Sequence, residues 1–321
     1  MQRILIAAIL FTPAAAFAQT APGDAATFRS ASTMVTVPAL VRGPSGGFAT
    51  GLDARDFALF DNGLPQQLKL ADLADEPIAM VVIVQTGGAA SRHFFDYADL
   101  PAFLDWMTGG TTHEIMLVTF DSRVQLIWHF PLRSDGVAYS MTHLNAGDRG
   151  AALLDAVQLG VQQLQNEPGS FRRIVLLISQ ETDQGSSTAP EEALRALGKG
   201  STAVYALTFV APKAKSVRGT ARSRHRMDEE TPLAAAVKAM REHTATQLAA
   251  YTGGVHLTFS TRREFDEAIQ AIANDIRNRY VLAFQPAAHD PGIHRLTVQV
   301  RKGLSATARD GYWFDPIGDD H

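Results

Sequence analysis

The sequence predicts an α/β fold in which an open, mostly parallel sheet carries helices on both faces and is inserted between two β-rich flanks. Continuous apolar runs are typical of strands buried on both faces of a parallel sheet. Five such runs occur, at residues 78–84, 115–120, 174–178, 203–210 and 255–259. Helical patterns lie between them, and this alternation of strand and helix favours an open α/β sheet.

Three helical segments have recognisable starts or apolar faces. One covers about residues 151–165 and has apolar residues on a single face. Another begins near Pro190, where proline and the following acidic residues suit a first helical turn. The third begins at Thr261, which forms a capping-box pattern with Glu264. Residues 124–130 follow the second apolar run too closely for a helical crossover, so we expect an antiparallel pair at the sheet edge.

The two flanks read as short strands separated by turns. In the N-terminal flank, residues 33–75, Asn62-Gly63 predicts a hairpin between residues 57–60 and 67–70. The other strand-like segments are residues 34–41 in this flank and residues 280–284, 296–300 and 306–309 in the C-terminal flank, residues 278–314. We expect the flanks to pair into one small β-sandwich, with a Rossmann-like domain at about residues 76–277 inserted in it.

Composition excludes several classes of site. The chain has 321 residues, a formal net charge of -4 and no cysteine. Disulfides, thiolate zinc sites and a cysteine nucleophile are therefore excluded. The charge provides no general attraction to nucleic acid or to an anionic membrane, so neither is an expected partner.

The N-terminus resembles a secretory signal peptide at residues 1–18. Arg3 precedes a short apolar run, and Ala16-Phe17-Ala18 is a small-x-small cleavage site. The run is much shorter than the roughly 20 residues that a membrane-spanning helix needs, so we predict no membrane span. An uncleaved anchor is the alternative. Residues 19–32 are expected to be a flexible linker, and the mature protein to be periplasmic or secreted.

Two further segments lack apolar periodicity. Residues 211–231 contain seven basic residues or histidines before three acidic ones, and are interpreted as a flexible basic surface loop. A docking patch for an acidic partner is the alternative. An RNA-binding arm is disfavoured because no aromatic residue is present to stack on a base. Residues 315–321 are expected to be a tail.

The expected ligand-binding edge of the sheet is formed by three loops. In open α/β sheets, ligands bind beyond the carboxyl ends of the strands. The loops are residues 85–91, 148–152 and 179–186.

These loops and both flanks resemble the von Willebrand factor A domain proteins of the bacterial exported "VWFA-related" family. The flanking motifs that carry the resemblance are residues 52–66, residues 276–284 with Pro286, and residues 309–312. The resemblance covers roughly residues 33–314. It implies a divalent cation held by Asp-x-Ser-x-Ser in the first loop, a threonine in the second and an aspartate in the third.

The chain departs from that pattern at every ligand position. Gln85 stands where the first aspartate belongs, and Gly87 and Ala89 stand where the serines belong. Ala151 replaces the threonine, and Gln180 replaces the third-loop aspartate. A neutral amide oxygen does not offset the dehydration of Mg²⁺ as a carboxylate does. We therefore predict a degenerate site that holds no metal.

A relocated set of oxygen ligands is the alternative. Its members would be Thr86, Ser91, Asp148, Glu181 and Asp183. Each of these is otherwise interpreted as a solvated loop residue or a helix cap. Asp155 matches a further aspartate of the family and is expected to be structural.

No enzymatic motif is present. Gly87-Gly88 fails the Gly-x-Gly-x-x-Gly spacing of a dinucleotide site, and the ten histidines include no pair at i and i+4. We predict no cofactor and no catalytic residue. The predicted function is a non-enzymatic protein-interaction module with an unidentified protein partner. A metal-dependent adhesion module for Mg²⁺, Mn²⁺ or Ca²⁺ and a structural envelope component are the alternatives, and a hydrolase comes third. The expected contact residues are Gln85, Thr86, Gly87, Gly88, Ala151, Gln180 and Glu181.

Overall fold

The computed structural model describes most of the chain after its N-terminal region. The described residues are 34–71, 76–108, 110–132, 134–168, 171–210, 231–287 and 290–315. Outside them lie the predicted signal peptide and linker, residues 211–230 of the predicted basic loop, and residues 316–321 of the predicted tail. None of the helices within these ranges has the length and apolar character needed to cross a membrane.

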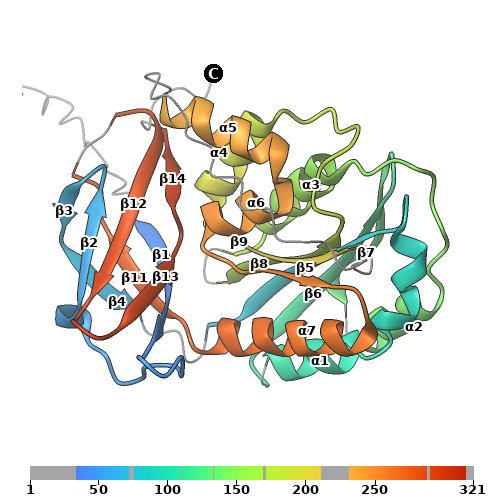
Figure 1. Ribbon diagram of the computed structural model, residues 1–321, viewed down its shortest axis with the longest axis horizontal. Coiled ribbons are helices and arrows are strands. Elements are labelled where there is room, and N and C mark those ends of the chain that lie inside the picture. Colours follow the sequence, from blue (N-terminus) through green and yellow to red (C-terminus); the bar gives the residue numbers. More distant parts are fainter. Residues whose placement is uncertain are drawn as a thin grey trace, which may run out of the picture. The chain divides into compact units, whose positions relative to one another are not determined.

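A six-stranded sheet of order β10-β9-β8-β5-β6-β7 forms the α/β part of the molecule (Figure 1). Every neighbouring pair is parallel except β6 and β7, which form the antiparallel pair expected at the edge. The mixed α/β fold with a mostly parallel sheet is thus confirmed. The strands are β5 (Ile78–Gln85), β6 (His113–Phe120), β7 (Val124–Leu132), β8 (Arg172–Ser179), β9 (Ala203–Phe209) and β10 (His256–Phe259).

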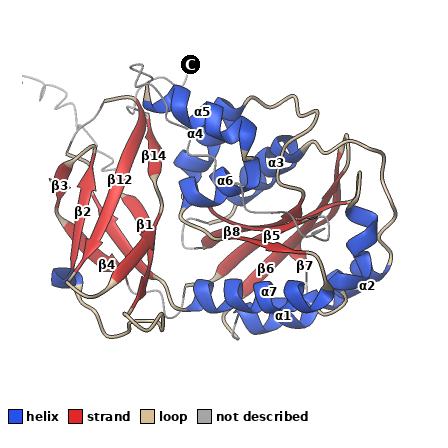
Figure 2. Ribbon diagram, viewed as in Figure 1, coloured by secondary structure: helices blue, strands red, loops and turns tan. Residues whose placement is uncertain are grey.

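Helices cover both faces of this sheet (Figure 2). One face packs against η2 (Ala90–Tyr97), α1 (Leu100–Thr108), α2 (Ser134–Thr142) and α7 (Arg262–Arg277). The other packs against α3 (Leu153–Gln165), α4 (Pro190–Gly200), α5 (Pro232–Glu242) and α6 (Thr244–Thr252). Every residue of β5 is buried, and consecutive residues such as Val81 and Val82 pack into the cores on opposite faces of the sheet. This burial on two faces explains the unbroken apolar runs.

The helix starts follow the sequence signals closely. Pro190 opens α4 with acidic residues in its first turn. The Thr261 hydroxyl accepts the Glu264 backbone N–H at the start of α7. The Glu264 carboxylate returns to the backbone N–H and hydroxyl of Ser260 instead of to Thr261. Residue ranges for η2, α1, α2, α5 and α6 were not predicted.

The flanks form two four-stranded sheets, of order β13-β1-β11-β4 and β14-β12-β2-β3. Each sheet combines strands from both ends of the described chain. Their buried side chains share one core, which includes Val37, Leu59 and Leu282. The strands are β1 (Val35–Arg42), β2 (Phe57–Asp61), β3 (Leu64–Gln66), β4 (Leu68–Ala71), β11 (Tyr280–Phe284), β12 (Gly292–Val300), β13 (Ser305–Ala308) and β14 (Gly311–Phe314).

The predicted hairpin in the N-terminal flank is right in its turn and wrong in its second strand. Asn62 and Gly63 both have positive φ, 48° and 82°, as a two-residue hairpin turn of this sequence requires. The partner of β2 is the short strand β3. Residues 68–71 instead form β4, which pairs with β11 in the sheet of order β13-β1-β11-β4. This happens because the chain leaves the sheet that contains β2 and β3 at Gln67.

Arg279 and Tyr280 join α7 to the flanking sheets. The Arg279 guanidinium donates to Asp275 Oδ1 at 2.5 Å and also to the Gly253 carbonyl. The Tyr280 hydroxyl donates to the Ala49 carbonyl at 3.0 Å and accepts the Leu52 N–H at 3.1 Å. Both flanking motifs of the family resemblance therefore contribute to this junction.

Candidate functional site

The loops after β5, β6 and β8 meet the loop before α3 at the carboxyl edge of the sheet. Gly88 N–H donates to the Asp148 carbonyl at 2.7 Å, and Gly147 N–H donates to the Thr86 carbonyl at 3.0 Å. Ala151 and Gln184 exchange two backbone hydrogen bonds, at 3.1 and 2.8 Å. Backbone contacts thus hold the predicted loops together.

Gln85 and Gln180, two of the residues predicted to form a degenerate site, bind each other. The Gln85 carboxamide N–H₂ donates to Gln180 Oε1 at 3.2 Å and to the Gly87 carbonyl at 3.1 Å. Gln85 Oε1 accepts the Gln180 backbone N–H at 2.8 Å. The Gln180 amide donates to the Thr182 carbonyl at 2.7 Å. Both amide oxygens are therefore engaged by N–H donors of the protein.

Gly87 leaves no room for a side chain. A Cβ atom at this position would lie 2.2 Å from the Gly150 carbonyl oxygen and 2.9 Å from Asp121 Cβ. Distances this short require the backbone to move. The loop before α3 and the loop after β6 therefore pack against Gly87 where a larger residue would place its side chain.

Asp148 is exposed, but its carboxylate is bound within the loops. Oδ1 accepts the Ser122 N–H at 3.0 Å and the Gly150 N–H at 2.7 Å, and Oδ2 accepts the Ser122 hydroxyl. These bonds, with that of the Ser122 hydroxyl foremost, hold the pKa of Asp148 below its ordinary value. The carboxylate links the loop after β6 to the loop before α3.

Asp183 and Asp155 fix the start of α3. Asp183 Oδ1 accepts the Leu154 N–H at 3.0 Å and the Ser186 hydroxyl at 2.5 Å. The Asp155 carboxylate accepts backbone N–H groups of Ser187 and Thr188, at 3.0 and 2.7 Å. Burial raises the pKa of Asp155, but these hydrogen bonds outweigh it and the net shift is downward. Asp155 has the structural place expected of it.

Glu181 turns away from the other loops toward α6 and β10. Oε1 accepts the Thr246 N–H at 3.1 Å, and Oε2 lies 3.0 Å from His256 Nε2. Burial raises the pKa of Glu181, but the hydrogen bonds from His256 and Thr246 lower it below its ordinary value. Within the described residues, no group of three or more His, Asp and Glu side chains is placed to hold a metal.

Thr246, His256 and Glu181 have the hydroxyl–imidazole–carboxylate order of a hydrolytic triad. Thr246 Oγ1 lies 3.0 Å from His256 Nδ1. The arrangement also needs backbone donors for an oxyanion. The N–H groups of Ala245, Thr246 and Gln247, which lie nearest in sequence, all donate within the protein. The cluster therefore resembles an anchor for the third loop more than a catalytic centre.

The predicted contact residues differ in exposure. Gln85 and Ala151 have 0% exposed surface, and Thr86 and Gly87 are also buried. Only Gly88, Gln180 and Glu181 keep surface for a partner. The buried members hold the loops together and offer little or no surface to a partner.

An exposed aromatic pocket that the sequence did not reveal lies beside these loops, between β7 and α2. Trp128 is 42% exposed and donates its indole N–H to Ser140 Oγ at 2.5 Å. The exposed Tyr139 ring stacks on His143, with centroids 4.1 Å apart. The cavity of about 370 Å³ also reaches Thr86, so it adjoins the first loop. Sequence patterns cannot separate an exposed edge-strand tryptophan from a buried one.

Two exposed arginines are close in sequence to residues that line this pocket. Arg123 lies between Asp121 and Gln125, which both line it, and Arg149 follows closely after Gly147, another lining residue. Both arginines are exposed, and neither forms an ion pair with any residue that the structure describes.

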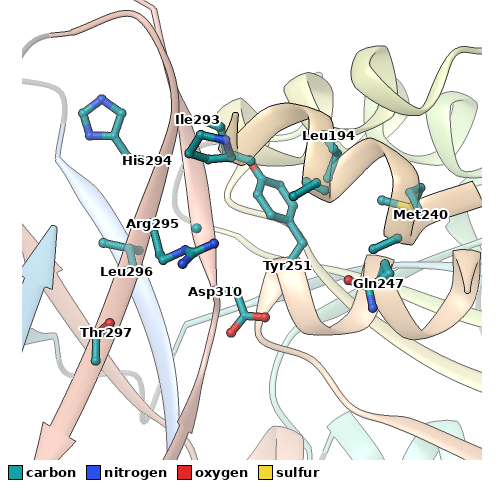
Figure 3. A pocket seen from close by; sticks show the side chains of 15 residues that line it. Leu194, Met240, Gln247, Tyr251, Ile293, His294, Arg295, Leu296, Thr297 and Asp310 are labelled. Atoms are coloured by element: carbon teal, nitrogen blue, oxygen red, sulfur yellow. The ribbon is translucent and has the colours of Figure 1, made fainter. Parts of the chain in front are cut away.

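A larger cavity, of about 480 Å³, lies elsewhere, between helices α4, α5 and α6 and strand β12 (Figure 3). Leu194, Met240 and Tyr251 border it from the helices, and Arg295 and Asp310 border it from the strand side. No predicted site residue lines it.

No protein-family model and no curated protein matches the sequence. Several solved structures are similar in fold. An aerotolerance-related membrane protein from Bacteroides fragilis aligns at 13% identity over 62% of this chain and 98% of its own, with a TM-score of 0.44. The conserved hypothetical protein BatB from Bacteroides thetaiotaomicron aligns at 13% identity over 62% and 97%, with a TM-score of 0.41. Proximal thread matrix protein 1 from the mussel byssus aligns at 10% identity over 64% and 50%, with a TM-score of 0.45. Similarities of this degree carry no information about function.

Proposed function

We propose that the chain is an exported, non-enzymatic protein-interaction module. In this proposal a von Willebrand factor A-like domain, set between flanking sheets that form a small β-sandwich, recognises its partner without a bridging metal. The single observation that carries the proposal is the hydrogen-bonded pair of Gln85 and Gln180 at the two aspartate positions.

The pair opposes metal binding for two reasons. Both amide oxygens already accept N–H groups, so a cation would have to break those bonds before it could bind. Neutral amides also stabilise bound Mg²⁺ less than carboxylates do, and so offset less of the free energy that this ion needs to lose its water. The relocated alternative would need Asp148, Asp183 or Glu181 to give up hydrogen bonds that fix the loops.

The partner surface of this proposal is the aromatic pocket together with two nearby arginines. Trp128 and Tyr139 line the pocket, and Arg123 and Arg149 each lie two residues from another lining residue. Tryptophan, tyrosine and arginine are the residue types that contribute most to binding in protein interfaces. A partner would place an apolar side chain in the pocket, and a carboxylate could pair with an arginine that has no internal partner.

Site-specific cross-linking in cells tests this surface. A photoreactive amino acid at Tyr139 should capture a specific protein, and Trp128→Ala should remove most of that product. The matched control is the same photoreactive amino acid at Trp106. This residue is 41% exposed, belongs to α1 and does not line the pocket. Equal capture at both positions, or no capture at Tyr139, would contradict the proposal.

A further inference from the structure

The cavity beside β12 has the size of a small-molecule site. Its volume of about 480 Å³ falls within the range of roughly 300–1,000 Å³ that is usual for such sites. It shares no lining residue with the aromatic pocket, so it is independent of the function proposed above.

The helical wall of this cavity is apolar. Ala235, Ala239 and Met240 contribute it from α5, and Leu194 contributes from α4. Leu194 and Met240 are each 1% exposed, so they are fixed in the core and offer only a surface to a ligand. This wall suits an aliphatic side chain.

The strand wall carries one cation and one anion. Arg295 pairs in register with Gly311 of β14, and the Leu296 N–H donates to the Asp310 carbonyl at 2.9 Å, so Arg295 and Asp310 are neighbours. Figure 3 shows both side chains between the strands and the helix that carries Tyr251 and Gln247.

Neither charged side chain forms a hydrogen bond or ion pair among the described residues, and both are exposed to solvent. Arg301, just beyond the end of the same strand, instead pairs with Asp56 at 3.3 Å. Partial burial raises the pKa of Asp310 against the opposing effect of Arg295, as expected for a carboxylate without a donor.

Tyr251 adds an unsatisfied polar group beside the cavity. It is 6% exposed, and its hydroxyl finds no hydrogen-bond partner among the described residues. Burial raises the pKa of Tyr251 to about 12, so the group is a neutral phenol that can still donate a proton. Buried hydroxyls usually have a partner, so the lack of one here points to a ligand or water.

We propose that this cavity binds a small zwitterion with an apolar side chain, namely an apolar α-amino acid or a short apolar peptide. The ligand carboxylate pairs with the Arg295 guanidinium, and its ammonium group pairs with the Asp310 carboxylate. The aliphatic side chain rests on Ala239 and Met240. Binding uses both charges, because the ligand carries a carboxylate for Arg295 and an ammonium group for Asp310.

Titration calorimetry of the purified full chain tests the proposal with L-leucine and L-leucyl-L-leucine as probes. At least one of the two should bind, and the tighter one identifies free amino acid or peptide as the source. 4-Methylpentanoate, which lacks the ammonium group, and 3-methylbutylamine, which lacks the carboxylate, should bind at least about tenfold more weakly.

Variants locate the binding. Arg295→Gln and Asp310→Asn should each weaken it about tenfold or more, because each removes one charge-assisted hydrogen bond. Arg301→Gln, just beyond the end of the same strand, is the matched control and should bind as the wild type does. The proposal is overturned if neither probe binds, if the singly charged analogues bind equally well, or if Arg301→Gln has the same effect as Arg295→Gln.

Discussion

The hydrogen bonds of Gln85 fix the arrangement of the loops at the carboxyl edge of the central sheet. Its carboxamide makes three hydrogen bonds in a site with no exposed surface, two of them to Gln180. A buried amide with every group satisfied stabilises one arrangement of the loops, and removing its partners would leave unmet donors and acceptors. The Gln85 side chain is therefore a hydrogen-bonded link between the ends of β5 and β8.

Gly87 provides the sharpest test of that packing. We expect Gly87→Ser to destabilise the protein by about 1–3 kcal/mol or more, because the new side chain overlaps the Gly150 carbonyl. Chemical denaturation would measure the change. Gly43→Ser is the control, since a Cβ there meets nothing nearer than 3.8 Å. A Gly87→Ser protein of unchanged stability that gained Mg²⁺ binding would show that the loops open easily.

The loops are anchored to helix ends by carboxylates, and this makes stability depend on pH. The pKa of Glu181 in the folded protein lies below its ordinary value of 4.5. A lowered folded-state pKa contributes stability above the unfolded-state value, and that contribution is lost as the pH falls through the folded-state value. The contribution of Asp155 to stability depends on pH in the same direction, because its pKa is also lowered in the folded protein.

Glu181→Gln should therefore flatten the loss of stability in acid. Urea unfolding measured between pH 7 and pH 3 should show a smaller decrease for this variant than for the wild type. Glu192→Gln is the control, because Glu192 is exposed on α4 and is expected to leave the wild-type pH dependence intact. An equal decrease in wild type and Glu181→Gln would refute the anchoring role.

The strands of the central sheet could be predicted because burial on both faces forces unbroken apolar runs, as in β5. The hairpin partner of β2 could not, because β4 has a pattern that suits either sheet and its pairing with β11 joins residues more than 200 positions apart. The loops of the candidate site followed from strand direction alone. The burial of Gln85 did not, since it depends on Gln180, 95 residues away. The exposure of Trp128 depends likewise on how α2 packs.

A buried ion pair lies where the chain passes from α7 into a flanking sheet. Arg279 and Asp275 have side chains that are each 2% exposed, and the Tyr205 hydroxyl donates to Asp275 at 3.0 Å. The residue after Arg279, Tyr280, begins β11 in a flanking sheet. The chain therefore enters that sheet directly after charged groups that have little access to solvent.

Arg279→Met should destabilise the whole molecule by about 3–5 kcal/mol, because it leaves the Asp275 charge buried without its partner. Thermal unfolding would measure the effect. Arg277→Met, which removes an exposed guanidinium near Trp106 two residues earlier, should change stability by less than about 1 kcal/mol. Equal effects of the two substitutions would mean that the buried pair does not hold the junction.

Thermal unfolding with and without metal shows whether the carboxyl edge of the central sheet binds a divalent cation. The purified protein would be melted in EDTA and then in excess Mg²⁺, Mn²⁺ or Ca²⁺. An ion that binds only the folded state, at 100 times its dissociation constant, adds about 2.7 kcal/mol and raises the melting temperature by a few degrees. We predict no shift with any of the three ions. Stabilisation by one of them that Asp183→Ala or Asp148→Ala abolishes would contradict the account and identify a metal-dependent adhesion module with relocated ligands.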